Sequence, residues 1–348
     1  MRTPGFWWSA KPAAPARALM AALAPAAAAY GALTALRMAR RGARAPLPVI
    51  CVGNFVAGGA GKTPAALAIA ARLAALGARP AFLTRGHGGS LSRRSGATRV
   101  DPAAHTAREA GDEPMLLAAV APTFVARDRL AGARAARADG ADVAVLDDGL
   151  QNPAIVKDLA IAVIDGAVGA GNGRVVPAGP LRAPLAAQWP HVHAALVVGE
   201  GPPGEAMADM ARLLGKTVLR ARLAPDPDVA AALGGARVLA LAGIGRPGKF
   251  VATLEETGAE VARLAAFGDH HPFTVAEIAP LVEEAARRGL RLVTTAKDAA
   301  RMAADAALRP LLAQMTVLPV TLQFADVAEV DALLAGALVA GPRPATAS

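Results

Sequence analysis

The stretch LPVICVGNFVAGGAGKTP, residues 47–64, decides the fold of this chain. Residues 47–52 form an apolar run, which predicts a strand buried on both faces. A glycine-rich loop follows the strand, and we expect a helix from Thr63 to about Leu76. Pro64 suits the first turn of that helix because the backbone N–H there has no partner to lose. A buried strand, a glycine loop and a helix in this order predict a phosphate-binding loop.

The loop departs at one position from the pattern G-x-x-x-x-G-K-[ST]. Val56 stands where the pattern has its first glycine, and Gly53 lies close enough to serve the turn out of the strand. Backbone N–H groups at a helix N-terminus bind phosphate, the lysine adds positive charge and the threonine hydroxyl holds Mg²⁺. We therefore expect ATP and Mg²⁺ as cofactors. The predicted cofactor-binding residues are Gly58, Gly59, Ala60, Gly61, Lys62 and Thr63.

A phosphate-binding loop of this kind needs acidic residues for Mg²⁺ at the end of a neighbouring buried strand. The run ADVAVLDD (141–148) ends in Asp147 and Asp148. The apolar residues before this pair favour the end of a buried strand over a surface turn. The predicted metal ligands are Thr63, Asp147 and Asp148.

Short apolar runs alternate with helical segments along the rest of the chain. Further strands are expected at 80–84, 160–165, 195–199, 238–245, 292–296 and 316–322. This alternation predicts an α/β fold whose parallel sheet is covered on both faces. The expected parts are an N-terminal membrane-associated helix with a basic flank (1–45), a P-loop NTPase-like domain (46–225) and a smaller α/β domain (236–340). Residues 224–236 are interpreted as a linker, and the glycine- and proline-rich stretch 166–184 is long enough to favour function or disorder.

Residues 18–36 form an uncharged run that is long enough to cross a bilayer. As a helix, these 19 residues would span about 28 Å, which is close to the hydrocarbon thickness. Residues 6–8, FWW, precede the run and suit the membrane–water interface. Four arginines follow it and suit an anionic leaflet, at positions 37, 40, 41 and 44. A membrane-associated helix is therefore favoured, and a soluble core helix is the alternative because Pro25 and Gly31 interrupt the run.

Charge is distributed unevenly along the chain. The first 100 residues hold 14 Lys and Arg and no acid, whereas the remaining 248 hold 23 basic and 28 acidic residues. The positive charge of the first 100 residues indicates that a membrane surface with anionic lipids is a partner. The alternative is a general bias of the composition toward arginine and alanine. Nucleic acid is not expected, because aromatic residues for base stacking are scarce. The single cysteine, Cys51, excludes an internal disulfide framework and a cysteine-rich zinc site.

Eight motifs, taken together, resemble those of the tetraacyldisaccharide 4'-kinases of lipid A assembly. They occur in order along almost the whole chain: VGNFVAGGAGKTP (52–64), RGHGG (85–89), AGDEPMLLA (110–118), DDGLQN (147–152), NGRVVPAGPLRAP (172–184), LALAGIGRPGKF (239–250), FGDHHPFT (267–274) and TTAKDAAR (294–301). The phosphate loop without its first glycine is itself the form found in this family. The resemblance therefore explains Val56 as a family variant.

The resemblance implies a reaction and a location. A kinase of this family transfers the γ-phosphate of ATP, with Mg²⁺, to the 4'-hydroxyl of an acylated glucosamine disaccharide that bears a 1-phosphate. The acylated lipid would be met at the cytoplasmic face of the inner membrane of a Gram-negative cell. The implied fold is a large phosphate-loop domain and a smaller α/β domain, with the active site in the cleft between them.

The resemblance also implies roles for individual residues. The implied catalytic residues are Asp112, His270, Lys62 and Arg182. Asp112 matches the candidate catalytic base and His270 matches the histidine that pairs with it, whereas Arg182 matches an arginine that stabilises charge near the phosphates. Helix capping is the alternative for Asp112. Four positions depart from the family pattern, and the roles of the last three are not transferred: His87, Asn152, Ala183 and Ala296.

Two other functions use the same phosphate loop. Positioning and partition ATPases carry a lysine before the glycine pair, where this chain has Ala57, and they lack a second α/β domain with a DHH motif. A non-catalytic, membrane-bound nucleotide sensor would bind ATP and Mg²⁺ without turnover, and it would not need Asp112 or Asp147. Both acids are present, which favours the kinase.

Overall fold

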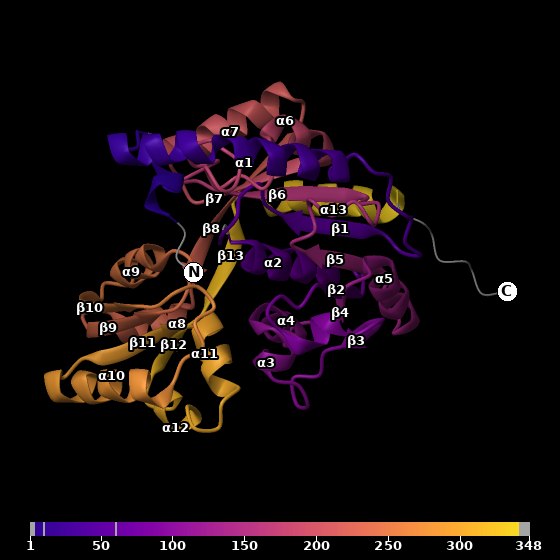
Figure 1. The fold of residues 1–348 in the computed structure, drawn as a ribbon. Helices are drawn as coiled ribbons and strands as arrows, with labels where there is room; N and C mark the ends of the chain where they lie inside the picture. The colour runs from indigo at the N-terminus through magenta and orange to yellow at the C-terminus, as the bar shows by residue number, and fades with distance from the viewer. Residues whose placement is uncertain (1–3, 10, 60, 341–348) are drawn as a thin grey trace.

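The computed structural model describes residues 4–9, 11–59 and 61–340, and Figure 1 shows two sheets with their helices. Ala60 of the predicted nucleotide-binding set lies outside the described residues. The larger sheet has nine strands in the order β13 (Val320–Phe324), β8 (Thr217–Pro225), β7 (Ala194–Val198), β6 (Leu159–Asp165), β1 (Val49–Gly53), β5 (Val143–Asp147), β2 (Pro80–Thr84), β4 (Thr123–Ala126) and β3 (Ala97–Arg99). The smaller sheet has four, in the order β10 (Glu260–Ala266), β9 (Arg237–Ala242), β11 (Arg291–Thr295) and β12 (Thr316–Leu318).

Both sheets are parallel except at the two edges of the larger one. There β3 is antiparallel to β4 and β13 is antiparallel to β8. The central strand β1 lies between β5 and β6 with every residue buried, as expected for a strand covered by helices on both faces. The predicted α/β fold with a parallel sheet is therefore confirmed.

Helices cover both faces of the larger sheet. On one face, α2 (Lys62–Ala75) packs with α13 (Val327–Ala340) over side chains such as Ile50 and Ile161. The opposite face is covered by α5 (Arg129–Ala138) and α7 (Pro202–Leu213). The remaining helices are α3 (Ala107–Ala110), α4 (Asp112–Ala118), α6 (Leu185–Gln188), α8 (Pro227–Leu233), α9 (Pro247–Glu256), α10 (Val275–Arg288), α11 (Ala296–Ala303) and α12 (Arg309–Leu312), with 3₁₀ turns at Gly5–Trp8, Ser90–Arg93 and Trp189–His191.

The C-terminal segment belongs to the larger sheet, contrary to the expectation that 236–340 form one unit. The run expected as one strand at 316–322 breaks at Pro319, which separates β12 in the small sheet from β13 in the large one. The chain thus crosses between the sheets twice, and the two crossings are joined by a 2.9 Å bond from the Asp226 N–H to the Pro319 carbonyl. Proline supplies the break because it has no N–H for the ladder.

The expected linker at 224–236 is also different in the structure. It contains the end of β8 and the helix α8, whose N-cap residue Asp226 accepts hydrogen bonds from the N–H groups of Asp228 and Val229. The sequence APDPD predicts a loop by its prolines, but Pro227 occupies the first helical position, where proline is well tolerated. The connection is therefore a capped helix.

The N-terminal helix α1 (Ala14–Met38) lies along the outside of the larger sheet's unit (Figure 1). Among the described residues it is the one helix long and apolar enough to cross a membrane, judged by length and composition. Its buried residues form a single stripe: Met20, Ala27, Gly31, Thr34 and Met38. Apolar side chains remain exposed on the rest of it, including Leu33 at 68% and Leu36 at 70%. Pro25 lies inside the helix without ending it.

The aromatic residues before α1 do not all take the interfacial position that the sequence suggests. Trp7 is buried, and its indole N–H donates to the Pro177 carbonyl at 3.1 Å. The Asn172 N–H donates to the Trp7 carbonyl at 2.8 Å. The N-terminal segment is thus bound to the stretch 166–184, which connects β6 to α6 without a helix or strand of its own.

We predict that α13 is part of the main core. Leu334 is fully buried against α2, where Arg72 also holds Asp331 through two hydrogen bonds of 2.9 and 2.6 Å. Leu334→Ala is expected to lower the free energy of unfolding by about 2–5 kcal/mol in urea denaturation. Val339→Ala, at a position 70% exposed, is the matched control, with a change within about 0.5 kcal/mol. Equal effects of the two substitutions would contradict the packing of α13 in this core.

Candidate active site

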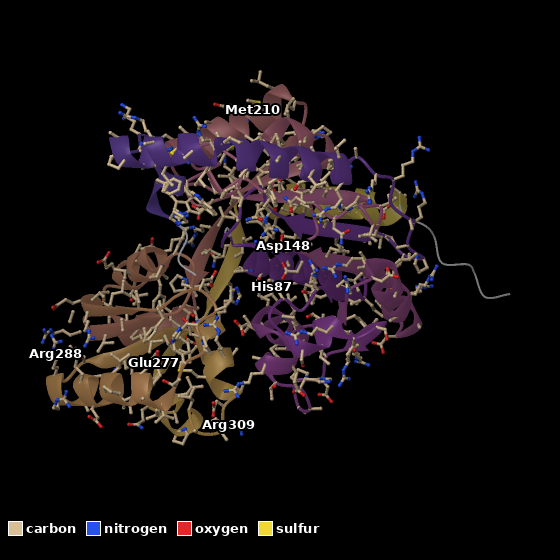
Figure 2. All side chains as sticks on the ribbon, in the orientation of Figure 1. His87, Asp148, Met210, Glu277, Arg288 and Arg309 are labelled. Carbon is tan, nitrogen blue, oxygen red and sulfur yellow. The ribbon has the colours of Figure 1, made fainter. Side chains whose placement is uncertain are left out.

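A cavity of about 610 Å³ opens where the strands of the larger sheet end and the smaller sheet faces them. Asp148 and His87 lie near the middle of the molecule, at this boundary (Figure 2). The carboxyl ends of parallel strands are the usual place for a ligand site in an α/β sheet. Seven of the predicted site residues line the cavity together: Gly58, Gly59, Lys62, Asp147, Asp148, Arg182 and His270. Asp112 lines an adjoining pocket that shares His270, and Gly61 and Thr63 do not line either one.

The phosphate loop joins β1 to α2. Gly58 and Gly61 have φ of +119° and +86°, which are backbone conformations that favour glycine. The Lys62 ammonium lies 3.4 Å from the Gly58 carbonyl, to which it donates, and 3.6 Å from the Asp148 carboxylate. The lysine therefore points back along its own loop, where the phosphates of a nucleotide would be held.

The structure explains why valine replaces the first glycine of the pattern. Val56 is buried and forms a β-bridge with Leu181, so the loop leaves β1 in an extended conformation. Gly53 is needed for a different reason, because a side chain there would meet Leu150 at 2.7 Å. The bridge also places Arg182, because the backbone N–H of Arg182 donates to the Phe55 carbonyl at 2.9 Å.

The two adjacent aspartates have opposite environments. Asp147 ends β5, and its Oδ1 atom is buried without a hydrogen-bond partner. Burial, together with the negative charges of Glu113 and Asp148, raises the pKa of Asp147 to about 8. The Asp148 carboxylate instead receives two hydrogen bonds from Arg182, both 2.8 Å. Burial raises the pKa of Asp148, but Lys62 and Arg182 outweigh it and lower that pKa to about 2.

Asp112 and His270 meet across the boundary between the sheets. His270 Nδ1 lies 3.1 Å from Asp112 Oδ2, and the Arg301 Nε–H donates to the same oxygen at 2.8 Å. Burial raises the pKa of Asp112, but these hydrogen bonds and the charge of Arg301 lower it to about 2. Asp112 begins α4 and its side chain does not cap it, because the N-cap residue is Gly111. The capping alternative for Asp112 is thus not what the structure shows.

Strained backbone occurs at two of these side chains. Asp148 and His270 have φ of 57° and 56°, and they are the two residues other than glycine with positive φ in the described part of the chain. Such conformations are costly and cluster at functional sites, where the surrounding contacts impose them. Both residues line the cavity, so its lining is held in place by the fold around it.

Several cavity residues have no counterpart among the sequence predictions. Three arginines follow β2 and β4, namely Arg85, Arg127 and Arg129. Arg129 is 3% exposed with its Nε atom unpaired, and burial, with Arg85 nearby, lowers its pKa. The strand β4 is not among those predicted from the sequence, so the sequence analysis does not place these arginines together.

Arg301, Lys297 and Glu113 are also missing from the predicted set, although each lies inside a quoted motif. Lys297 and Glu113 form an ion pair of 3.1 Å between the two sheets. Arg301 reaches from α11 to Asp112 and is itself held by the fully buried Asp298 at 2.9 Å. The motifs AGDEPMLLA and TTAKDAAR were the signals that could have identified them.

Two of the four residues that depart from the family pattern line the cavity, and the other two do not. The His87 ring lies 6.2 Å from the His270 ring in an edge-on arrangement, so it lines the site. Asn152 also lines the cavity and its side chain accepts from the Ala154 N–H at 2.9 Å. Ala183 is fully buried, and Ala296 begins α11.

Comparisons with known proteins identify the family of this chain. A family model described as tetraacyldisaccharide-1-P 4'-kinase matches residues 19–339. Curated relatives named tetraacyldisaccharide 4'-kinase include one from Methylobacterium nodulans, 55% identical over 99% of this chain and 98% of its own length. Another, from Rhodospirillum centenum, is 52% identical over 96% of each chain.

A solved structure has the same fold. The crystal structure of LpxK from Aquifex aeolicus in complex with ATP matches with a TM-score of 0.67 at 22% identity. The match covers 92% of this chain and 99% of that one. With the family model and the close relatives, the result is unambiguous: this chain belongs to the tetraacyldisaccharide-1-P 4'-kinase family.

Proposed function

We propose that this protein transfers the γ-phosphate of ATP to the 4'-hydroxyl of a tetraacyl glucosamine disaccharide 1-phosphate, a step of lipid A biosynthesis. The observation that carries the proposal is that the phosphate loop and His270 line one cavity, while Asp112 lies 3.1 Å behind His270 Nδ1. A positioning or partition ATPase has no need of such a pair from a second sheet. The names of the relatives agree with the proposed reaction.

ATP is the proposed phosphate donor. The loop amides, Lys62 and Arg182 would bind its phosphates, since all three face the cavity and carry positive charge or N–H groups. Arg182 is held by Asp148 in a bidentate pair, which leaves the guanidinium fixed beside the loop. The LpxK crystal structure of the same fold is described as a complex with ATP.

Mg²⁺ is the proposed metal, and the residues present fit it. Asp147 has a buried carboxylate oxygen without a partner and a pKa raised to about 8, so a cation beside it would relieve an unfavourable environment. In the described residues no three His, Cys, Asp or Glu side chains gather to hold a metal by themselves. Asp147 and the Thr63 hydroxyl would therefore share the ion with phosphate oxygens, with Asp148 beside them, and the ion would neutralise phosphate charge.

His270 is the proposed proton acceptor, with Asp112 as its partner. A carboxylate with a pKa of about 2 is a weak base, whereas imidazole is the commonest general base. With its Nδ1 atom directed at Asp112, His270 leaves Nε2 to accept the proton of the sugar hydroxyl. Asp112 then orients the ring and stabilises the positive charge that forms on it.

Three further arginines line the cavity and could bind the phosphate group that the lipid carries. Arg85, Arg127 and Arg129 line the cavity, and none of them has an acidic partner within ion-pair distance among the described residues. Guanidinium groups bind phosphate through two parallel hydrogen bonds. We propose that this group binds the 1-phosphate of the disaccharide.

We propose that the protein works at the cytoplasmic face of the inner membrane, with α1 as its anchor. The exposed apolar side chains of α1 would enter the bilayer, and Arg37 in its last turn lines the cavity. The helix therefore ends at the site itself. Acyl chains held in the bilayer would place the sugar headgroup near that end, beside the anionic headgroups that the arginines 37, 40, 41 and 44 favour.

The first prediction from this proposal concerns the reaction. With γ-labelled ATP and Mg²⁺, the protein is expected to label a tetraacyl disaccharide 1-phosphate, and removal of Mg²⁺ with a chelator is expected to abolish labelling. The product is separated by thin-layer chromatography and the 4'-position is established by mass spectrometry. Hydrolysis of ATP that is stimulated by DNA, with no labelled lipid, would instead favour the partition ATPase.

The second prediction separates the roles of His270 and Asp112. His270→Gln is expected to lower kcat by about 10²–10⁴-fold with little change in the KM for ATP, because the proton acceptor is lost. Asp112→Asn is expected to lower kcat less, since an amide oxygen can still accept from the ring. His105→Gln, outside the cavity, is the control. A fully active His270→Gln variant combined with an inactive Asp112→Asn variant would return the base role to Asp112.

The third prediction tests the anchor without touching the Trp7 contacts. Leu33→Glu with Leu36→Glu is expected to reduce sedimentation with anionic lipid vesicles and phosphorylation of bilayer-embedded substrate, because each buried leucine is worth about 1.5–3 kcal/mol. Binding of a non-hydrolysable ATP analogue should be unchanged. Val339→Glu, equally exposed on α13, is the control. Vesicle binding that survives the double substitution would exclude α1 as the anchor.

A further inference from the structure

Lys297 brings a second lysine into the cavity from the smaller sheet's unit. It is the second residue of α11, and its side chain is 22% exposed. Its ammonium lies 3.1 Å from Glu113 Oε1 and 3.5 Å from His270 Nε2. A cation therefore lies beside the nitrogen that is proposed to accept the sugar proton.

Lys62 begins α2 and Lys297 lies on α11, and both side chains line the same cavity. Burial raises the pKa of Glu113, but Lys297 and then Lys62 lower it below its ordinary value. The same two lysines oppose the upward shift of the pKa of Asp147. Lys62 on the phosphate loop and Lys297 on α11 line the same cavity as these two carboxylates.

Hydrogen bonds hold the backbone that carries Lys297. Its side chain, in contrast, lies within reach of two groups, the Glu113 carboxylate and the His270 ring. Thr295 caps α11 by accepting from the Asp298 N–H at 3.1 Å, and Asp298 accepts from the Gly243 N–H at 2.9 Å. Asp298 has no exposed surface, so the helix start cannot shift easily. The flexible lysine stem can nevertheless turn its ammonium from one anion to another.

We propose that Lys297 is a catalytic residue whose ammonium leaves Glu113 and His270 for the transferring phosphoryl group when ATP is bound. The inference rests on the proposed phosphoryl transfer. The bond between the γ-phosphorus and the β,γ-bridging oxygen breaks, a bond from the same phosphorus to the sugar 4'-oxygen forms, and the hydroxyl proton passes to His270 Nε2. Lys297 exchanges no proton. It neutralises charge on the equatorial oxygens, and its departure uncovers Nε2.

The competing explanation is that Lys297 and Glu113 form only a structural ion pair between the sheets. The two explanations differ in what each partner contributes. A structural pair loses the same contact when either residue is replaced, whereas a catalytic lysine matters for turnover far more than its carboxylate partner does. The geometry favours catalysis, since the lysine also reaches His270 and lines the cavity.

The test compares full-length variants in the lipid phosphorylation assay. Lys297→Met is expected to lower kcat by about 10²–10³-fold with the KM for ATP changed less than about threefold. Lys297→Arg should retain part of the activity, because it keeps the charge. Lys216→Met, outside the cavity, is the matched control and should match the unsubstituted protein. Equal losses of kcat and of melting temperature in Lys297→Met and Glu113→Gln would overturn the proposal.

A binding measurement separates this inference from the proposed reaction. ADP with Mg²⁺ and aluminium fluoride imitates the transferring phosphoryl group without the lipid. Lys297→Met is expected to weaken that complex by about 10²-fold and to leave ADP binding within about threefold, measured by calorimetry. If the unsubstituted protein labels no lipid yet binds the mimic through Lys297, the proposed function fails and the role of Lys297 stands. If Lys297→Met binds the mimic as tightly as the unsubstituted protein, the role of Lys297 is excluded.

Discussion

The structure of the site depends on one carboxylate that joins the two sheets. Asp112 lies at the start of α4 on the larger sheet, and both of its partners, His270 and Arg301, come from the smaller sheet's unit. Because Arg301 is in turn held by the buried Asp298, the contact extends into the core of that unit. A charge-assisted network of this kind is costly to leave partly paired, so it specifies how the sheets face each other. This contact holds His270, which lines the same cavity as the phosphate loop.

Charge complementarity then organises the cavity. Three of its four acidic members are Glu113, Asp147 and Asp148, and they share the cavity with Lys62, Lys297 and Arg182. Asp148 and Glu113 are well compensated, whereas Asp147 is not, as its unpartnered oxygen and raised pKa show. The site is therefore prepared for one more cation beside Asp147 and for an anion between the lysines, which matches what a phosphate-loop kinase must bind.

The apolar helix α1 and the nucleotide loop are connected through shared contacts. The segment before α1 binds the stretch 166–184 through Trp7, and the same stretch ends in Arg182 beside the phosphate loop. α1 itself ends at Arg37, which lines the cavity. The proposed anchor helix is thus connected at both of its ends to the residues that would bind phosphate.

The sequence by itself determined the α/β class, the strand–loop–helix unit at 47–64, the acids at the end of β5 and the apolar helix at 18–36, because each is a local pattern of apolar period, glycine or charge. The contact of Asp112 with His270 was reached only through the family resemblance. Tertiary structure alone decided that β13 and α13 return to the larger sheet, that Trp7 is buried and that Asp112 is held by Arg301. The tertiary structure also decided that Arg182 pairs with Asp148, whereas one carboxylate oxygen of Asp147 has no hydrogen-bond partner. These features depend on pairs of residues far apart in the chain, and the energy of such pairs comes from burial and distance, which no local pattern contains.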